Sequence, residues 1–102
     1  MRFSHKDKKD DRVVKHSTYP LDYPSKISEA PDQHGVYILM DSEQSVIYVG
    51  ATSTEGLQNT IKANSKVTLE NKITQYRWFI TKNSDGANSL KKDWIKKYEL
   101  QQ

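Results

Sequence analysis

Residues Gly35–Gly50 read GVYILMDSEQSVIYVG, and this stretch decides the fold. Two runs within it, GVYILM and SVIYVG, are rich in β-branched and aromatic residues, which favour strands. The polar residues DSEQ between them are typical of a turn. The stretch therefore predicts a β-hairpin. Because both runs are almost continuously apolar, we expect both faces of the hairpin to be covered.

Each predicted strand carries one tyrosine and one glycine. Gly35 and Tyr37 open the first strand, and Tyr48 and Gly50 close the second. Glycine permits a close backbone approach where a side chain would clash. Tyrosines on neighbouring strands can meet on one face of a sheet, where a phenol can donate a hydrogen bond or move a proton. Simple packing of the two rings is the plainer interpretation of the same pattern.

Charge is distributed unevenly along the chain. Six of the 16 Lys and Arg residues and three of the 13 Asp and Glu residues lie within residues 1–16, so this segment carries the whole net charge of +3. The segment is polar and poor in aromatic residues, which predicts a flexible charged tail, although it also has the charge to attract a phosphate backbone. Residues 17–102 form the predicted domain.

The remainder of the chain alternates strand-like and helix-like segments. Residues 17–34 hold all three prolines and predict an extended lead-in that packs apolar side chains on the core. Weak helical spacing follows Gly50, with Leu57 and Ile61 on one face. Residues 67–73 have an ambiguous, partly helical pattern, and the alternation in QYRWFIT predicts a strand. The lead-in side chains expected on the core are Tyr19, Leu21, Tyr23 and Ile27.

The clearest helix is predicted near the end of the sequence. Leu90, Trp94 and Tyr98 recur at a spacing of four, with lysines on the opposite side and Asn88 or Ser89 as the cap. The whole order predicts an α/β (α+β) domain, in which an antiparallel sheet of about three strands is flanked by helices.

Composition excludes several classes of protein. There is no cysteine, so there is neither a disulfide framework nor a thiolate metal site, and no histidine pair has metal-ligand spacing. No apolar run approaches the roughly 18 residues of a membrane span, and the first residues lack the apolar stretch of a secretory signal. We therefore expect a cytoplasmic protein without a membrane partner.

The two triplets GVY and YVG, ten residues apart, resemble the signature of the GIY-YIG nuclease superfamily. Thr52 stands where that family often has a small or hydroxyl residue, and SLKKDWIKKYEL is similar to its late helix. The resemblance covers about residues 20–100. It implies cleavage of phosphodiesters, in which a motif tyrosine assists the general base. It also implies one divalent metal held by a glutamate of the late helix, and an arginine of the first helix that steadies the phosphate charge.

The two charged residues of that signature, the arginine of the first helix and the glutamate of the late helix, are missing from this chain. Thr60 stands at the position of the arginine, with Lys62 as the nearest cation, and Lys91 stands at the position of the glutamate. A lysine there would repel Mg²⁺, whose sites need oxygen ligands. Three carboxylates elsewhere offer weaker replacements: Glu70, Asp93 and Glu99. The resemblance therefore implies a degenerate member that needs no cofactor, or Mg²⁺ if it is active.

We expect a nucleic-acid-binding protein, with DNA rather than RNA as the partner. Trp78 is a candidate to stack on a base. One alternative is a divergent metal-dependent endonuclease that uses Tyr37 and Tyr48. Another is an inhibitor or adaptor that binds a protein partner, which the balanced charge of residues 17–102 favours. The predicted nucleic-acid-binding residues are Lys62, Arg77, Lys91, Lys92, Lys96 and Lys97, with Gly35 and Gly50 as structural residues of the motif.

Overall fold

The predicted hairpin is the centre of the computed structural model, which describes residues 1–65 and 72–102. Strand β3 (Gly35–Met40) pairs antiparallel with β4 (Val46–Ala51), so that Tyr37 faces Gly50 across the two strands. In the turn, one carboxylate oxygen of Asp41 accepts the backbone N–H groups of Glu43 and Ser45, both at 2.9 Å. The polar DSEQ turn is therefore held by its first residue, as short polar turns often are.

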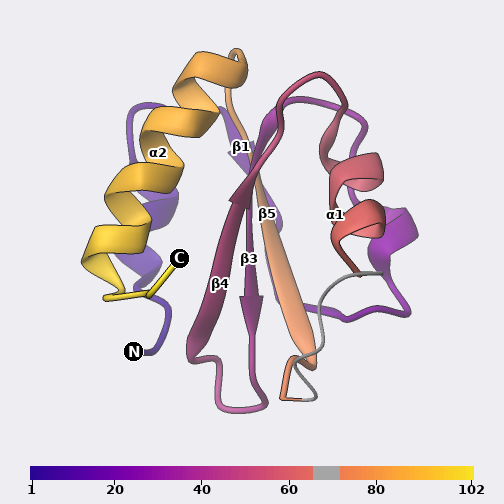
Figure 1. Ribbon diagram of the computed structural model, residues 1–102, viewed down its shortest axis with the longest axis vertical. Helices are drawn as coiled ribbons and strands as arrows, with labels where there is room; N and C mark the ends of the chain where they lie inside the picture. The colour runs from indigo at the N-terminus through magenta and orange to yellow at the C-terminus, as the bar shows by residue number, and fades with distance from the viewer. Residues whose placement is uncertain (66–71) are drawn as a thin grey trace.

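A third long strand completes the centre of the sheet. Strand β5 (Gln75–Ile80) pairs antiparallel with β3 on the side opposite β4. Two short strands, β1 (Lys15–His16) and β2 (Leu21–Asp22), pair with β5, which gives the order β1-β5-β3-β4 with β2 beside β5 (Figure 1). The α+β class and the three long antiparallel strands are confirmed. The sheet has five strands because parts of the expected tail and of the lead-in join it.

Helices cover both faces of the sheet, as the continuously apolar strands require. Helix α2 (Ser84–Lys97) lies on one face, and α1 (Leu57–Ser65) lies on the other, beside the 3-10 helix η2 (Ile27–Glu29) (Figure 1). Because side chains alternate along β3, Val36, Ile38 and Met40 join the core under α2, whereas Tyr37 and Leu39 join the core under α1. No described helix is long and apolar enough to cross a membrane.

Residues 1–16 differ from the flexible tail that the composition predicts. Phe3 is only 6% exposed, and its ring lies 5.6 Å from that of Phe79 and 6.5 Å from that of Trp94. The 3-10 helix η1 (His5–Lys9) follows, and β1 then joins the sheet. One aromatic side chain thus anchors a highly charged segment, which an average over its composition hides. The segment therefore packs on β5 and α2 and contributes a strand to the sheet.

Helix α2 begins earlier than the sequence predicts. Its N-cap is Asn83, whose side-chain oxygen accepts the N–H of Gly86 at 2.8 Å, and Asp85 lies in the first turn. In the sequence, Gly86 makes the first turn of this helix resemble a loop. The predicted stripe of Leu90, Trp94 and Tyr98 is confirmed as buried.

Two further expectations concern the segments around α1 and β2. Leu21 and Ile27 are buried and Tyr23 packs partly against the core, as predicted, but Tyr19 is 59% exposed. The ambiguous helical segment, including Glu70, falls largely outside the described residues. Leu57 and Ile61 are fully buried under the sheet, which confirms the shared face of α1.

Candidate functional site

Both motif glycines stand where any side chain would clash. A Cβ on Gly35 would overlap the backbone carbonyl of Phe79, and a Cβ on Gly50 would overlap the ring of Tyr37. The rings of Tyr37 and Tyr48 lie with their centroids 6.1 Å apart on the α1 side of the sheet. The two triplets therefore form one packed unit, in which a glycine on β4 makes the space that a tyrosine on β3 fills.

Tyr37 is the more enclosed member of the pair. It is 2% exposed, and its ring packs against that of Tyr48. Burial raises the pKa of the Tyr37 hydroxyl well above that of a free tyrosine, and the neighbouring Tyr48 and Tyr23 add to the shift. The phenol therefore stays protonated at neutral pH, and a phenolate base at this position is disfavoured. Tyr48 is half-buried and is the more accessible of the two.

A polar groove lies where β4 ends, beside the first turns of α2. Its volume is about 370 Å³. Thr52 links it to the motif, because its hydroxyl oxygen accepts the N–H of Gly35 at 3.0 Å and lies 3.1 Å from Nδ1 of His34. Lys91 is the cation of this groove and Asp85 is its carboxylate. The residues that line it are Ala51, Thr52, Ser53, Ser84, Asp85, Asn88 and Lys91.

The groove does not fit the magnesium site that the resemblance implies. Its single carboxylate, Asp85, shares the space with the ammonium group of Lys91, whose charge repels a divalent cation. Among residues 1–65 and 72–102, no group of three His, Asp or Glu side chains is placed to hold a metal ion. Sequence reasoning located Lys91 but missed the groove, because the early start of α2 brings Ser84, Asp85 and Asn88 to it.

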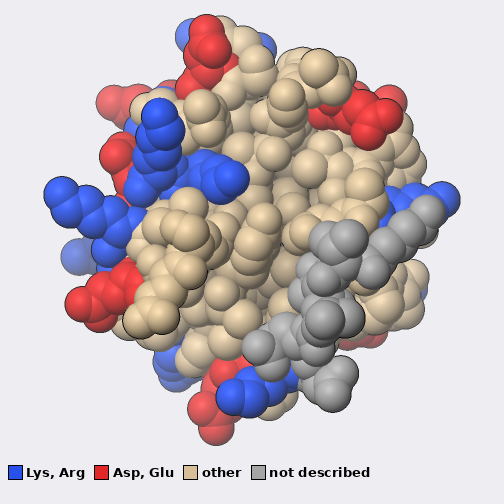
Figure 2. Space-filling model, viewed as in Figure 1, with Lys and Arg blue, Asp and Glu red and all other residues tan. Residues whose placement is uncertain are grey.

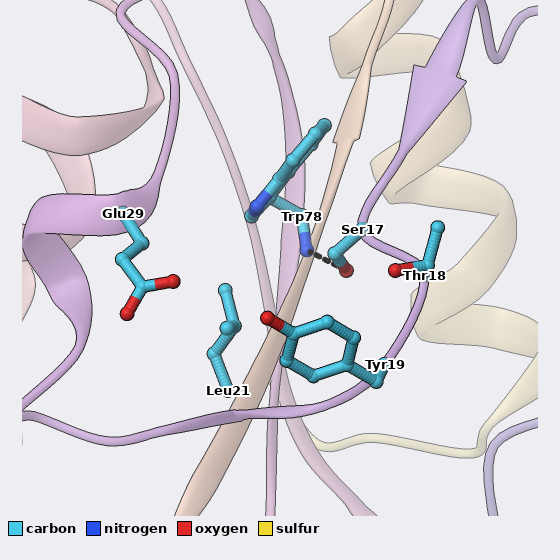
Figure 3. Close-up of a pocket in the computed structure, with 6 residues that line it drawn as sticks. All are labelled: Ser17, Thr18, Tyr19, Leu21, Glu29 and Trp78. Atoms are coloured by element: carbon cyan, nitrogen blue, oxygen red, sulfur yellow. Dashed lines mark hydrogen bonds between the residues drawn. The ribbon is translucent and has the colours of Figure 1, made fainter.

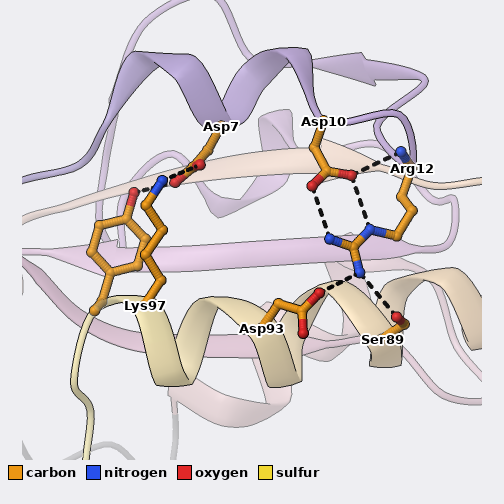
Figure 4. A network of polar contacts seen from close by, with 7 residues as sticks. Asp7, Asp10, Arg12, Ser89, Asp93 and Lys97 are labelled. Atoms are coloured by element: carbon orange, nitrogen blue, oxygen red, sulfur yellow. Dashed lines mark hydrogen bonds and ion pairs between the residues drawn. The ribbon is translucent and has the colours of Figure 1, made fainter.

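The lysines of α2 divide into two groups. Lys97 is bound to Asp7 of η1, and on the same helix Asp93 accepts a 2.7 Å contact from Arg12, which also binds Asp10 (Figure 4). Lys91, Lys92 and Lys96 form no ion pair within the described parts of the chain. Lys97 therefore serves mainly to attach η1, while these three remain the cations of α2 that a ligand can reach.

The six predicted basic residues do not form one surface. Lys62 is exposed on α1, so the sheet lies between it and α2. Arg77 is 3% exposed and lies on the α2 side of β5, with its guanidinium carbon 5.1 Å from the centre of the Phe3 ring. Arg77 is therefore not part of an exposed basic surface with the α2 lysines, because it is buried beside Phe3. Figure 2 shows blue and red side chains interleaved along the α2 side, around an uncharged centre.

Trp78 lines a different pocket, of about 140 Å³, on the α1 side (Figure 3). Ser17 accepts the backbone N–H of Trp78 at 3.2 Å, and the pocket also contains Tyr19, Leu21 and Glu29. The one charged lining residue is the carboxylate of Glu29, which would repel the phosphate attached to a stacking base. The structure thus places Trp78 apart from the α2 lysines, and its stacking on a base stays a prediction.

A search of protein-family models and of curated proteins found no match to this chain.

Proposed function

We propose that this chain is a nucleic-acid-binding protein built on a degenerate GIY-YIG-like domain. The observation that carries the proposal is the position of Lys91. It lines a groove with Thr52 and Ser53, which stand two and three residues after the motif glycine Gly50. In the family that the sequence resembles, this part of the late helix holds the metal that meets the scissile phosphate. Here a lysine takes that place and supplies positive charge itself.

The proposed contacts are to the sugar-phosphate backbone. Lys91 binds a phosphate at the groove, with the hydroxyl groups of Thr52 and Ser53 as neighbouring donors. Lys92 and Lys96 extend the positive charge along the outer side of α2. Asp85 lies in the same groove and opposes phosphate, so we expect moderate affinity with a marked dependence on salt.

The proposal includes no cleavage step. Tyr37 remains a neutral phenol because burial raises its pKa, and the groove does not fit Mg²⁺. The domain would then use the space of the ancestral active site to hold a backbone phosphate without breaking it. DNA is the preferred partner, by analogy with the nuclease superfamily.

Fluorescence anisotropy with labelled single-stranded, duplex and branched DNA, and with matching RNA, tests the binding. Lys91→Ala with Lys92→Ala should weaken binding about tenfold or more. The slope of log K against log salt should fall by roughly one unit per lost phosphate contact. Lys62→Ala is the control, because it removes one exposed lysine on the opposite side of the sheet. Equal loss in the control variant would contradict the assigned surface.

Two other outcomes separate the alternative functions. Metal-dependent nicking of DNA that disappears in Tyr48→Phe would establish a divergent nuclease and overturn the degenerate interpretation. Absence of binding to every nucleic acid at low salt would overturn the proposal and favour a protein partner.

A further inference from the structure

Arg77 is a buried guanidinium without a counter-charge. Its side chain is 3% exposed, and neither Nε nor Nη1 has a hydrogen-bond partner among residues 1–65 and 72–102. Within the described residues it forms no ion pair. A buried charge in proteins is normally paired, because the cost of taking it out of water is several kcal/mol. The guanidinium of Arg77 is therefore suited to bind an anion that is not part of this chain.

The surroundings of Arg77 are positive as well. Phe3 covers one side of the guanidinium, and the ring of His5 lies edge-on to Phe3 at 5.5 Å. Burial lowers the pKa of His5, and the charges of Lys8, Arg77 and Arg2 lower it further. Burial also lowers the pKa of Lys8, again with a contribution from Arg77. Phe3 thus contacts both Arg77 and His5, and the charges of Lys8 and Arg2 act on the same His5 ring.

Two of the three acidic residues of the N-terminal segment, Asp7 and Asp10, bind groups other than Arg77. Asp7 is the one acid within η1, and its two oxygens are bound to Tyr98 and Lys97. Asp10 is occupied by Arg12, through both of its oxygens (Figure 4). Each of these two carboxylates is therefore turned to a partner other than Arg77.

We propose that Arg77, His5 and Lys8, with Arg2 nearby, form a binding site for a phosphate group at the edge of η1. A phosphate offers several acceptor oxygens and up to two charges, and a guanidinium binds it through two parallel N–H groups. Because the cover over Arg77 is nearly complete, the site suits a terminal phosphate or a small phosphate ester. This site is separate from the Lys91 groove, and the inference does not depend on the proposed function.

Thermal unfolding in inorganic phosphate, at constant ionic strength with chloride as the reference anion, tests the site. Phosphate should raise the Tm of the wild-type chain by several degrees, because a ligand that binds only the folded state stabilises it. Arg77→Met should abolish this increase. It should also raise the Tm in chloride, because an apolar side chain then replaces an unpaired buried charge. Lys62→Met is the matched control, which removes an exposed lysine of α1 on the opposite side of the sheet and should keep the phosphate response.

The sources of the phosphate are distinguished by titration calorimetry. The probes are inorganic phosphate, a 5′-phosphorylated oligonucleotide, and the same oligonucleotide without its terminal phosphate. Stronger binding of the phosphorylated oligonucleotide, lost in Arg77→Met, would assign a nucleic-acid end. Binding of inorganic phosphate with no added gain from the oligonucleotide would assign a small ester. The double variant His5→Ala with Lys8→Ala changes the rim of the site and should weaken phosphate binding about tenfold. It provides a second test of the site if Arg77→Met does not fold.

Several results would overturn the proposal. One is a phosphate response of equal size in wild type and Arg77→Met. Another is no response in the wild type. A third is acetate stabilising the chain as much as phosphate, because the site would then accept a carboxylate such as that of a protein partner.

Discussion

The hydroxyl of Tyr98 donates a hydrogen bond to Oδ2 of Asp7 at 2.5 Å and so joins two residues 91 positions apart. The same hydroxyl accepts the N–H of Ser4 at 2.9 Å, and the other oxygen of Asp7 binds Lys97. Tyr98 follows the last turn of α2, and Asp7 lies in η1. This contact, more than any local propensity, fixes the first residues of the chain to the last helix.

Removing that hydroxyl should loosen the N-terminal segment. We expect Tyr98→Phe to lower the free energy of unfolding by about 1–3 kcal/mol, because it leaves the Ser4 N–H and one oxygen of Asp7 without their partner. Urea unfolding followed by circular dichroism measures the change. Tyr19→Phe is the control, since Tyr19 is exposed, and it should change stability by less than about 0.5 kcal/mol. Equal effects in both variants would contradict a special role for Tyr98.

Alkaline pH should destabilise the fold through buried tyrosines. Burial is the main cause that raises the pKa of Tyr37, Tyr76 and Tyr98 above the ordinary value of 10.0. Unfolded chains lose these protons near pH 10, whereas the folded protein retains them. The stabilisation is therefore complete below about pH 10 and is lost as the pH rises further.

Urea midpoints measured from about pH 8 to pH 11 test this dependence. The midpoint should fall above about pH 10, and the fall should be shallower in Tyr98→Phe, because one of the three titrating groups is then gone. A midpoint that stays constant across this range would show that burial does not hold these protons.

The Arg12 contacts form a second attachment of the N-terminal segment, and a weaker one. Arg12 binds Asp10 and Asp93, and it donates to the hydroxyl of Ser89 at 2.9 Å. Asp93 is 63% exposed, so solvent screens much of this interaction. We expect Arg12→Ala to lower the free energy of unfolding by about 0.5–1 kcal/mol. We also expect amide hydrogen exchange to be faster in residues 10–17 than in α1. Lys92→Ala, which removes an exposed lysine of α2, should leave both measurements unchanged.

The strength of the Arg12 attachment also depends on pH, through the ionisation of Asp10. The side-chain hydrogen bonds from Arg12 hold the pKa of Asp10 below its ordinary value of 3.8. The contribution of Asp10 is therefore present above that pH and is lost as the pH falls below it. The cost of Arg12→Ala should accordingly shrink in unfolding experiments below about pH 4. A cost that is the same at neutral and at acidic pH would contradict this linkage.

The hairpin and the stripe of α2 were predictable because they depend on local patterns. Strand composition, turn residues and a spacing of four are properties of neighbouring residues. The attachment of Asp7 to Tyr98 was not predictable, since nothing in a polar segment of six basic and three acidic residues indicates which carboxylate is buried. The start of α2 was missed because Gly86 hides the N-cap Asn83.

Arg77 shows a second limit of sequence patterns. Alternation placed Tyr76, Trp78 and Ile80 together on one face, which the structure confirms, and so left Gln75, Arg77 and Phe79 on the other. A polar pair on a strand normally indicates a solvent-exposed face. Here η1 and α2 cover that face, and the covering segment is the one that composition predicted to be mobile. Because residues 1–16 were expected to be mobile, Arg77 on β5 was expected to be exposed, whereas it is buried.

The close approach of Gly50 to Tyr37 makes Gly50→Ala the most direct test of how the hairpin packs. A methyl group at Gly50 would occupy the space of the Tyr37 ring, which is enclosed and has no room to move aside. We expect Gly50→Ala to lower the free energy of unfolding by about 1–3 kcal/mol, as overpacked cores do, and to alter the ring signals of Tyr37 and Tyr48 in NMR spectra.

The chain offers a matched glycine with the opposite expectation. A Cβ at Gly86, in the first turn of α2, would meet its nearest atom, Oδ1 of Asn83, at 3.4 Å, so Gly86→Ala should be accommodated. Alanine favours the helix and restricts the unfolded chain, so this variant should gain up to about 1 kcal/mol. Combining Gly50→Ala with Tyr37→Leu, which vacates the ring's position, should recover part of the loss. If Gly50→Ala were as stable as wild type, the packing of the two triplets described above would be wrong.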